Sequence, residues 1–269
     1  MGRLEFAGET LAEEITTYWN GRATSYSNGV RGELSDYRKD AWLNELHALF
    51  DVKLRELEAL ELTARAIDLG CGPGFFSILL SGMGCVVDAV DASAEMIERA
   101  KANIRAAGAA QQVTFHESDV CALPFEDNTF DIAASRNLTW LMRNPEGAYR
   151  EWLRVLKPGG IMVVFDANWY RYLVDADVNE RRVADQSSIM LEGWDWDAQA
   201  TSDEEKRCEQ IAALLPLTPV RRPGWDVAVL KRLGASEVIA DEAVGKRVWT
   251  QNEQDFYASS PLFLVKAVK

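Results

Sequence analysis

The sequence predicts an α/β fold with a doubly wound, seven-stranded and mostly parallel sheet. Three observations lead to this prediction: short apolar runs alternate with helical patterns, acids stand where several of these runs end, and glycines follow the first run. Such alternation is typical of parallel sheets that carry helices on both faces. The 269 residues are 48% hydrophobic, which is enough for one large core.

The first predicted strand leads into a glycine-rich turn. Residues Ala66 to Gly74 read A-I-D-L-G-C-G-P-G, in which Asp68 is followed by glycines at three alternate positions. Because glycine lacks a Cβ, the chain can turn sharply here and bring its backbone against a ligand. Pro73 has a fixed φ that suits the first position of a helix running on through Leu79.

The spacing of this turn excludes two common phosphate-binding motifs. A P-loop needs Lys and then Ser or Thr after its last glycine, and the dinucleotide motif G-x-G-x-x-G needs glycine where this chain has Phe75. Asp68 would repel a pyrophosphate but can accept hydrogen bonds from an ammonium group. The turn is therefore predicted to hold a ligand with a positive charge at this end.

Two further acids follow predicted strands. The run from Cys85 to Val90 reads as a buried strand ending at Asp91, and the run from Val113 to Leu123 contains a strand that continues into Asp119. An acid in the position of Asp91 can bind both hydroxyls of a ribose. The remaining predicted elements are a strand at 130–135, a helix at 145–156, a K-P-G-G turn at 157–160, a strand at 161–166 and strands at 236–240 and 261–268. Between them, residues 223–234 return to the pattern of the core domain.

Together these motifs resemble the class I S-adenosylmethionine-dependent methyltransferases of small-molecule type. The resemblance implies a Rossmann-like sheet whose last strand runs antiparallel beside the strand at 161–166, with S-adenosyl-L-methionine as cofactor and S-adenosyl-L-homocysteine as product. It also implies a division of the chain into an N-terminal helical lid (1–60), a cofactor-binding domain (61–167 and 223–269) and a helical cap insertion (168–222). The likeness is good over the sheet and hardly extends to the cap.

In the resembled family, the glycine turn contacts the methionine part of the cofactor, the acid at Asp91 binds ribose, and the acid at Asp119 binds adenine. Aromatic residues and an Arg in the segment 18–26 either reach the methionine end or cover the edge of the sheet. The expected cofactor-binding residues are Tyr18, Arg22, Tyr26, Asp68, Gly70, Cys71, Gly72, Gly74, Asp91, Ala92, Met96, Asp119, Val120, Ser135 and Arg136.

The acceptor is expected at the loops that follow the strands at 130–135 and 161–166, because open parallel sheets bind ligands at the carboxyl ends of their strands. Asp166 is the catalytic candidate, although an acid at a strand end can equally cap the next helix. Cys71 is predicted to be a small filler residue rather than a nucleophile. The expected substrate-binding residues are Asn137, Trp140, Asn168, Trp169 and Tyr170.

Other chemistry-bearing residues give weaker signals. His47 and His116 are the only histidines, and both are predicted to be structural rather than general bases. Trp194 and Trp196 either form an aromatic cage for the acceptor or anchor the cap to the core. Large aromatic side chains are usually mostly buried, which favours the anchoring role. The four cysteines are scattered, so no metal site is expected.

Charge and hydropathy limit the kinds of partner that the protein is expected to bind. The formal net charge of −13 opposes nucleic-acid binding, and there is no apolar run of membrane-spanning length and no signal peptide pattern. We therefore expect a cytoplasmic monomer or homodimer that methylates a small-molecule acceptor. A non-catalytic S-adenosylmethionine-binding sensor or scaffold subunit and a protein side-chain methyltransferase are the alternatives.

Overall fold

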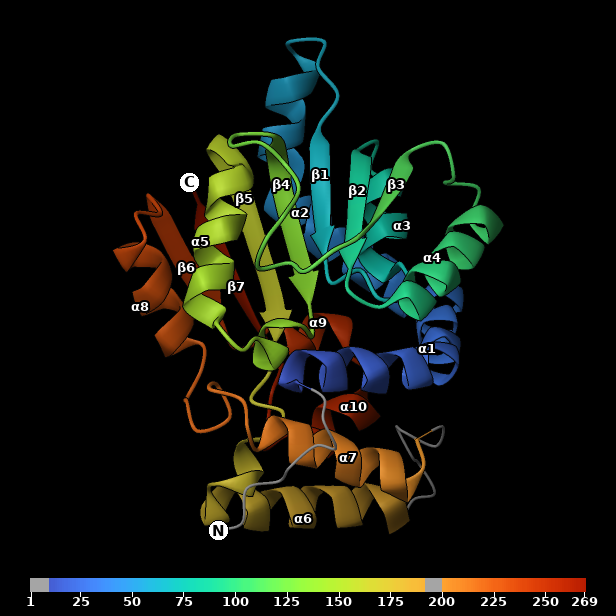
Figure 1. Cartoon of the computed structure of the whole chain (residues 1–269), viewed down its shortest axis with the longest axis vertical. Coiled ribbons are helices and arrows are strands. Elements are labelled where there is room, and N and C mark those ends of the chain that lie inside the picture. The colour runs from blue at the N-terminus through green and yellow to red at the C-terminus, as the bar shows by residue number, and fades with distance from the viewer. Residues whose placement is uncertain (1–9, 192–199) are drawn as a thin grey trace.

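The computed structural model describes residues 10–191 and 200–269 and shows one seven-stranded sheet with helices on both sides (Figure 1). The strand order is β3-β2-β1-β4-β5-β7-β6. All neighbouring pairs from β3 to β5 are parallel, whereas β7 is antiparallel to both β5 and β6. This confirms the predicted architecture. The strands are β1 (Arg65–Leu69), β2 (Val86–Asp91), β3 (Val113–Glu117), β4 (Phe130–Arg136), β5 (Leu156–Asp166), β6 (Glu237–Asp241) and β7 (Phe263–Val268).

The helices connect the strands and extend the chain beyond the sheet at one end. The α-helices are α1 (Leu11–Ser35), α2 (Arg38–Glu58), α3 (Phe75–Gly82), α4 (Ala94–Ala106), α5 (Pro145–Val155), α6 (Ala176–Leu191), α7 (Ser202–Ala212), α8 (Gly224–Arg232), α9 (Gly245–Val248) and α10 (Gln251–Phe256). Two short 3-10 helices, η1 (Thr139–Leu141) and η2 (Arg171–Leu173), follow β4 and β5.

Alternation along the strands divides the core into two layers. On β1, Ala66 packs with the apolar residues of α2 and α3, whereas Ile67 and Leu69 face the layer that contains α5 and α8. This follows from the two-residue period of a strand, which sends successive side chains to opposite faces. Because both faces are covered, the central strands β1, β2, β4 and β5 are mostly buried, whereas β3 and β6 near the two edges are partly exposed.

The N-terminal helix α1 is a polar helix that crosses the carboxyl end of the sheet (Figure 1). Thr10 and Glu13 form a capping box that starts it. Hydrogen bonds hold it to α4: Ser93 Oγ to Asn20 Oδ1 at 2.6 Å, Arg99 to Thr24 at 2.8 Å and Asn103 to Ser27 at 3.0 Å. Polar contacts therefore supply much of the docking of α1.

Two local predictions need correction. Helix α3 begins at Phe75 with Gly74 as its N-cap, so Pro73 precedes the helix instead of opening it. The K-P-G-G segment at 157–160 belongs to β5, where it forms an irregular widening opposite Asp131: Phe130 pairs with Leu156, and Ile132 with Ile161. Gly159 takes a φ of +73° within it. The extra residues are absorbed as a bulge in the strand.

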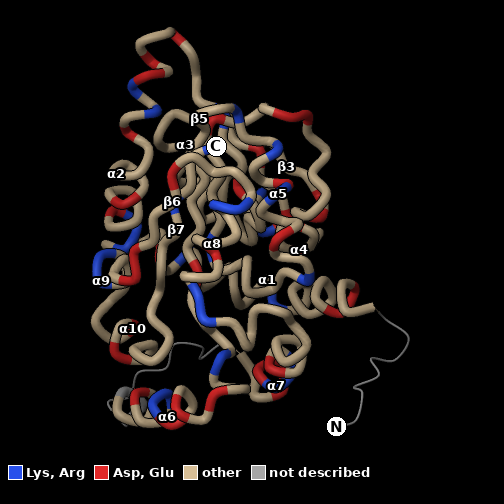
Figure 2. Tube along the Cα trace, turned by 90° about the vertical axis from the view of Figure 1, so that its left-hand side faces the viewer, with Lys and Arg blue, Asp and Glu red and all other residues tan. Residues whose placement is uncertain are grey.

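Helices α6 and α7 lie beyond α1 and α10, away from the sheet (Figures 1 and 2). Helix α7 contacts α1, and α6 contacts α10. Trp194 and Trp196 lie outside the described residues. A capping box of Thr201 and Glu204 starts α7.

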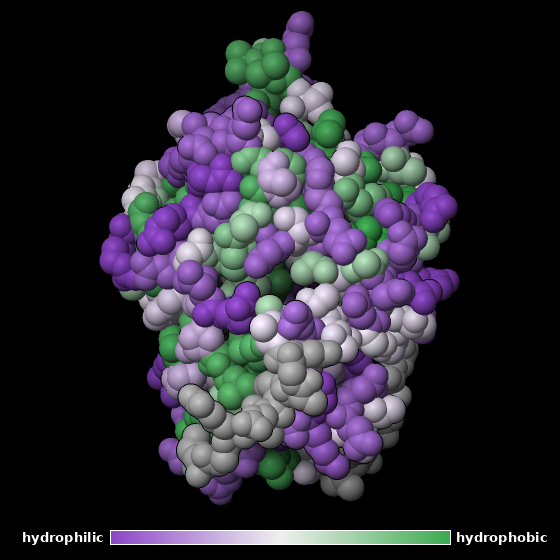
Figure 3. All heavy atoms as spheres, in the orientation of Figure 1, coloured by the Kyte–Doolittle hydropathy of each residue, from purple (hydrophilic) through white to green (hydrophobic). Residues whose placement is uncertain are grey.

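The surface carries mixed charge. In the view of Figure 2, Lys and Arg are interspersed with Asp and Glu along the helices. Polar residues dominate the face shown in Figure 3, and apolar atoms gather at the tip that follows α2, where Leu60 and Leu62 are exposed. None of the helices in the described residues is long and apolar enough to cross a membrane.

Trp42 joins α2 to the sheet. Its ring lies 5.9, 5.5 and 5.0 Å from those of Phe75, Phe76 and Phe165, and its side chain is fully buried. We expect Trp42→Ala to lower the free energy of unfolding by about 3–5 kcal/mol in urea denaturation, because a large cavity opens among aromatic rings. The control Val52→Ala, on the exposed side of α2, should change it by less than about 0.5 kcal/mol. Equal small effects would mean that α2 is not packed as described.

Candidate active site

A cavity of about 840 Å³ lies at the carboxyl ends of β1, β2 and β4, under α1. Three walls form it: the glycine turn after β1, the segments after β2, β3 and β4, and one side of α1. The expected site residues that line it are Tyr26, Asp68, Gly70, Cys71, Gly72, Asp91, Ala92, Met96, Asp119, Val120, Arg136 and Asn137. The structure therefore brings most of the expected cofactor residues together.

The glycines of the turn have different tasks. Gly70 and Gly72 line the cavity in the left-handed region, with φ of +66° and +50°. A Cβ on Gly70 would lie 2.7 Å from the Leu138 side chain, so only glycine fits between them. Gly74, with φ +90°, does not line the cavity; its missing Cβ makes room for Ala100 and Ile104 of α4. Sequence alone assigned all three glycines to the ligand.

Asp91 organises the turn from the end of β2. Its Oδ2 accepts a hydrogen bond from the Gly72 N–H at 2.8 Å, and its Oδ1 accepts one from the Ser93 N–H at 2.9 Å. Burial raises the pKa of Asp91, while these N–H groups act in the opposite direction. The carboxylate thus links the glycine turn, the cavity and the start of α4.

Asp68 is almost fully buried beside the turn, and its Oδ2 accepts a hydrogen bond from Ser77 Oγ at 2.6 Å. Burial raises the pKa of Asp68 to about 7, and the charge of Asp91 adds to this effect. Burial also raises the pKa of the Cys71 thiol well above its ordinary value. Cys71 is itself buried, and both observations favour the neutral thiol over a nucleophilic thiolate.

Asp119, Val120 and Cys121 form another part of the wall. Asp119 is exposed, and its Oδ1 accepts a hydrogen bond from the Cys121 N–H at 2.8 Å. The Cys121 thiol interacts with the same carboxylate through a side-chain hydrogen bond. Because a carboxylate can accept more than two hydrogen bonds, Asp119 still offers an acceptor beside the cavity, next to the apolar side chain of Val120.

Arg136 lines the cavity at the end of β4, where the preceding residue, Ser135, pairs with Leu69 at the start of the glycine turn. Its Nη2 donates to both carboxylate oxygens of Glu33 on α1, at 2.9 and 2.8 Å. Burial alone would lower the pKa of Arg136, but the Glu33 carboxylate raises it on balance. Glu33, which the sequence analysis missed, is buried on an otherwise polar helix. A buried acid on such a helix has no sequence signal of its own.

Four expected cofactor residues lie outside the cavity. Ser135 is fully buried, and Gly74 packs on α4. Arg22 donates from Nε to Ser25 Oγ at 3.2 Å, and burial together with Cys208 of α7 raises the pKa of Tyr18. Tyr18 and Arg22 thus belong to the contact between α1 and α7, because the helical twist turns them away from the cavity side that carries Trp19 and Tyr26.

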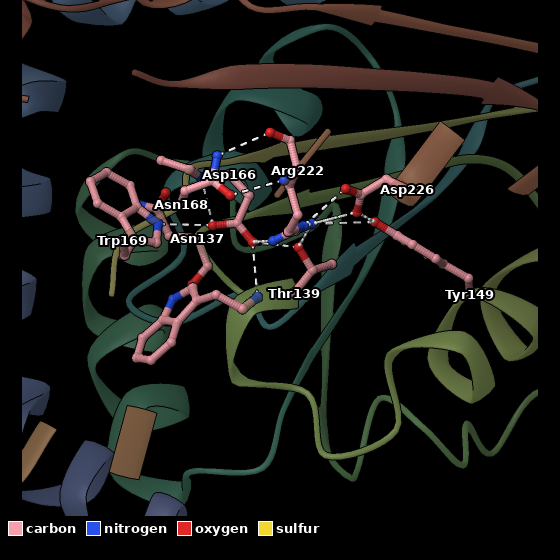
Figure 4. A network of polar contacts seen from close by, with 10 residues as sticks. Asn137, Thr139, Tyr149, Asp166, Asn168, Trp169, Arg222 and Asp226 are labelled. Carbon is pink, nitrogen blue, oxygen red and sulfur yellow. Dashed lines mark hydrogen bonds and ion pairs between the residues drawn. The ribbon is translucent and has the colours of Figure 1, made fainter. Parts of the chain in front are cut away.

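Asp166 lies in a buried charge network, not in the cavity (Figure 4). Its Oδ2 accepts hydrogen bonds from Thr139 Oγ1, from the Trp140 N–H at 3.0 Å and from Arg222 Nη1 at 2.9 Å. Its Oδ1 accepts from the Trp169 ring N–H at 2.8 Å. The side chain is fully buried. This geometry corrects the expectation that Asp166 touches an acceptor, since its oxygens are occupied by the protein itself.

Arg222 is the centre of this network. Its Nε lies 2.9 Å from Asp226 Oδ2, and its Nη2 donates to Asp226 Oδ1 at 2.6 Å and to Thr139 Oγ1 at 2.5 Å. The Tyr149 hydroxyl donates to Asp226 Oδ1 at 2.5 Å. The network therefore ties η1 to β5 and α8, and η1 continues directly from the cavity wall at Leu138.

The expected substrate-binding residues fall into two places in the structure. Asn137 lines the cavity, with φ +56° and an enclosed Oδ1 that has no hydrogen-bond partner in the described chain. Trp140, Asn168, Trp169 and Tyr170 instead surround a space of only about 10 Å³. Tyr170 donates to Cys208 Sγ at 3.0 Å. No described residue of 168–222 lines the large cavity, so these aromatic residues pack the cap against the body.

The two histidines lie away from the cavity. His47 Nδ1 is 2.9 Å from Asp51 Oδ1 on α2, and His116 Nε2 is 2.7 Å from Asp88 Oδ1 on the sheet. Neither histidine lines the cavity. Within residues 10–191 and 200–269, His, Cys, Asp and Glu form no group of three or more that could hold a metal ion.

Sequence reasoning missed much of the apolar wall. The residues that complete it are Ala12, Ile15, Thr16, Trp19 and Val30 of α1, Phe75 and Phe76 of α3, and Leu138, Leu141 and Met142 after β4. On α1, the spacing of Ala12, Ile15, Thr16 and Trp19 marks one helix face and is the signal that could have found them. The loop residues after β4 carry no periodic signal.

The sheet order, the glycine turn and the acids after β1, β2 and β3 define a nucleoside-binding α/β domain. Residues 67–164 match the family model described as a methyltransferase domain. This match confirms the resemblance to class I S-adenosylmethionine-dependent methyltransferases that the motifs predict.

Curated relatives with different acceptors share this domain. The chain is 31% identical over 163 residues to a ubiquinone/menaquinone biosynthesis C-methyltransferase of Pseudomonas savastanoi pv. phaseolicola, with 58% of each chain covered. It is 25% identical over 199 residues to the botryococcene C-methyltransferase of Botryococcus braunii, covering 68% of this chain and 52% of that one. The chain thus spans little more than half the length of these relatives.

Solved structures share the fold. A protein described as an S-adenosyl-L-methionine-dependent methyltransferase, from Methanococcus maripaludis, has a TM-score of 0.54 and 21% identity, with 94% of each chain covered. A protein described as a sarcosine dimethylglycine methyltransferase, from Galdieria sulphuraria, has a TM-score of 0.54 and 18% identity, covering 86% of this chain and 85% of that one. These likenesses concern the architecture alone.

The buried network gives a stability prediction. We expect Arg222→Met to lower the free energy of unfolding by about 3–5 kcal/mol, because the Asp166 and Asp226 carboxylates lose the cation between them. The matched control is Arg232→Met, which breaks the exposed pair of Arg232 with Glu146 and should cost less than about 1 kcal/mol. Chemical denaturation measures both. Similar losses in the two variants would contradict the central position of Arg222.

Proposed function

We propose that the protein transfers a methyl group from S-adenosyl-L-methionine to a small-molecule acceptor. The observation that carries the proposal is the cavity in which a glycine turn meets Asp91 and Asp119, beside a methyltransferase-domain match that includes all of these residues. The curated relatives act on different acceptors, so they support the reaction class and leave the acceptor open.

The chemistry of the cavity fits this cofactor. Gly70 and Gly72 leave room for a ligand against the main chain, and Asp91 and Asp119 offer carboxylates at the cavity that suit ribose hydroxyls and an amine. Asp68 is an acid that burial makes costly to ionise, and a ligand ammonium group offsets this cost. When bound, S-adenosylmethionine supplies an electrophilic methyl group.

The protein groups around the reacting atoms mainly align the acceptor with the methyl group and exclude water. Neither histidine lines the cavity, and Asp166 is engaged elsewhere. The carboxylates that do line it are Glu13, Asp68, Asp91 and Asp119, and each of them accepts a hydrogen bond from the protein. We infer that proximity carries most of the acceleration, with an acceptor atom that is already nucleophilic near neutral pH.

The size of the cavity supports a small acceptor. Its volume of about 840 Å³ falls near the upper end of the roughly 300–1,000 Å³ typical of small-molecule sites, which leaves room for a second small ligand. Helix α1 covers this space, and Ile15, Trp19, Leu138 and Leu141 give it an apolar wall. A folded protein substrate would have to displace α1. The cytoplasmic location and the oligomeric state stay predictions.

Transfer of a radiolabelled methyl group tests the proposal. The protein is incubated with labelled S-adenosylmethionine and cell extract, and the extract is then separated by size. We expect label in the small-molecule fraction. Label in protein would instead identify a side-chain methyltransferase, and binding of the cofactor without any transfer would identify a sensor or scaffold.

The ribose contact gives a binding prediction. Asp91→Ala should weaken S-adenosylhomocysteine at least about tenfold in calorimetry, because a charge-assisted hydrogen bond to the ligand and the anchor of the Gly72 N–H are both lost. The control is Asp88→Ala on the same strand, whose carboxylate pairs with Arg65 and His116 away from the cavity. Unchanged affinity in Asp91→Ala would remove Asp91 from the site.

The raised pKa of Asp68 gives a pH prediction. An ammonium group binds the ionised carboxylate, so binding requires loss of the Asp68 proton, and affinity should rise with pH up to the pKa of about 7 and then level off. We expect S-adenosylhomocysteine to bind about tenfold more weakly at pH 6 than at pH 8, as linkage to one group with this pKa requires. Asp68→Asn should flatten this profile. A flat profile in the unmodified protein would place the ammonium elsewhere.

A further inference from the structure

One edge of the Arg136 guanidinium is an unused binding group. Glu33 engages only Nη2, whereas Nε and Nη1 donate to no residue that the structure describes. Neither nitrogen is among the enclosed polar atoms of the described chain that lack a partner. Since Arg136 lines the cavity and its side chain is 12% exposed, these N–H groups are open to a ligand.

The guanidinium is held rigidly. Its central carbon lies 4.4 Å from the centre of the Phe75 ring and 4.8 Å from that of the Trp42 ring. Glu33, whose side chain is 7% exposed, holds the guanidinium in place by hydrogen bonds in addition to the two rings. A planar cation between two rings and a carboxylate loses little further freedom when it binds a ligand.

The surroundings select the kind of anion. Asp68 and Asp91 line the same cavity, so a ligand with several negative charges would be repelled. A single planar carboxylate matches the donors of a guanidinium in shape and charge. Asp68 accepts from Ser77 and Arg136 stacks on Phe75, which places an acid and a cation beside the same first turn of α3.

We propose that Arg136 is a carboxylate-binding subsite, with Glu33 of α1 as its positioning residue and Asp68 as the partner for a neighbouring ammonium. The subsite fits an α-amino acid group or another small carboxylate. The inference rests on the proposed function, which offers two sources of this group: the amino-acid tail of the cofactor and the methyl acceptor.

Two probes distinguish these sources in calorimetry. S-adenosylhomocysteine carries the amino-acid tail, and methylthioadenosine is the same kind of thioether nucleoside without it. If Arg136 binds the cofactor tail, Arg136→Gln weakens S-adenosylhomocysteine at least tenfold and changes methylthioadenosine less than twofold. If Arg136 binds the acceptor, both affinities stay unchanged, and the protein loaded with S-adenosylhomocysteine binds benzoate at least tenfold more weakly after the substitution.

Glu33→Gln tests the positioning role. We expect it to reduce the preference for S-adenosylhomocysteine over methylthioadenosine if Arg136 binds the cofactor tail, or to weaken benzoate on the loaded protein if Arg136 binds the acceptor, with methylthioadenosine affinity retained. General loss of folding would instead lower the affinity for both nucleosides. The matched control is Arg38→Gln, which breaks another Arg–Glu pair, with Glu253, outside the cavity lining.

Three outcomes overturn the subsite: unchanged affinity for every probe, benzoate included, in Arg136→Gln; equal losses for both nucleosides; or a Glu33→Gln variant that changes neither the nucleoside preference nor the benzoate affinity. If the unmodified protein binds neither nucleoside, the proposed function itself fails. Binding of both nucleosides without any effect of Arg136→Gln removes only the subsite.

Discussion

The tight turn between β1 and α3 is the constraint on which the rest of the site depends. Leu138 occupies the place where a side chain on Gly70 would stand, and the Asp91 carboxylate holds the Gly72 N–H. The ends of β1, β2 and β4 are thereby fixed against one another at one point. A cavity forms there because the main chain turns away in the left-handed region and α1 crosses above it.

Two arginines, Arg222 and Arg136, determine the distribution of charge around the glycine turn. Arg222 lies with Asp166 and Asp226 behind the cavity wall and holds η1, whereas Arg136 lies in the wall and keeps part of its guanidinium open. The first compensates buried carboxylates that no ligand reaches. The second, together with Asp68, gives the cavity a cation and an acid near the same helix turn. Fixed charges of this kind favour a zwitterionic or cationic ligand in a molecule whose formal net charge is −13.

The sheet could be predicted from sequence because each strand is a short apolar run and the punctuating residues are glycines and acids. The same reasoning located Asp68, Asp91 and Asp119 correctly at the cavity, since the carboxyl ends of parallel strands share one edge. It could not distinguish the role of Asp91 from that of Asp166, because both stand at the ends of buried strands. Only the structure shows that Arg222, which is distant in sequence, binds the Asp166 carboxylate. The inward side of α1 is marked in the sequence only by the spacing of Ala12, Ile15, Thr16 and Trp19, which is a weak apolar stripe on a polar helix and is easily passed over. Tyr18 and Arg22 were therefore placed at the ligand although they face α7.

A crystal structure of the protein with S-adenosylhomocysteine tests the central claim most directly. The account predicts that density for the nucleoside fills the cavity under α1, with ribose at Asp91, adenine at Asp119 and Val120, and the amino-acid tail along Gly70 and Gly72. An empty cavity at saturating ligand, or the nucleoside bound at another place on the molecule, would contradict it.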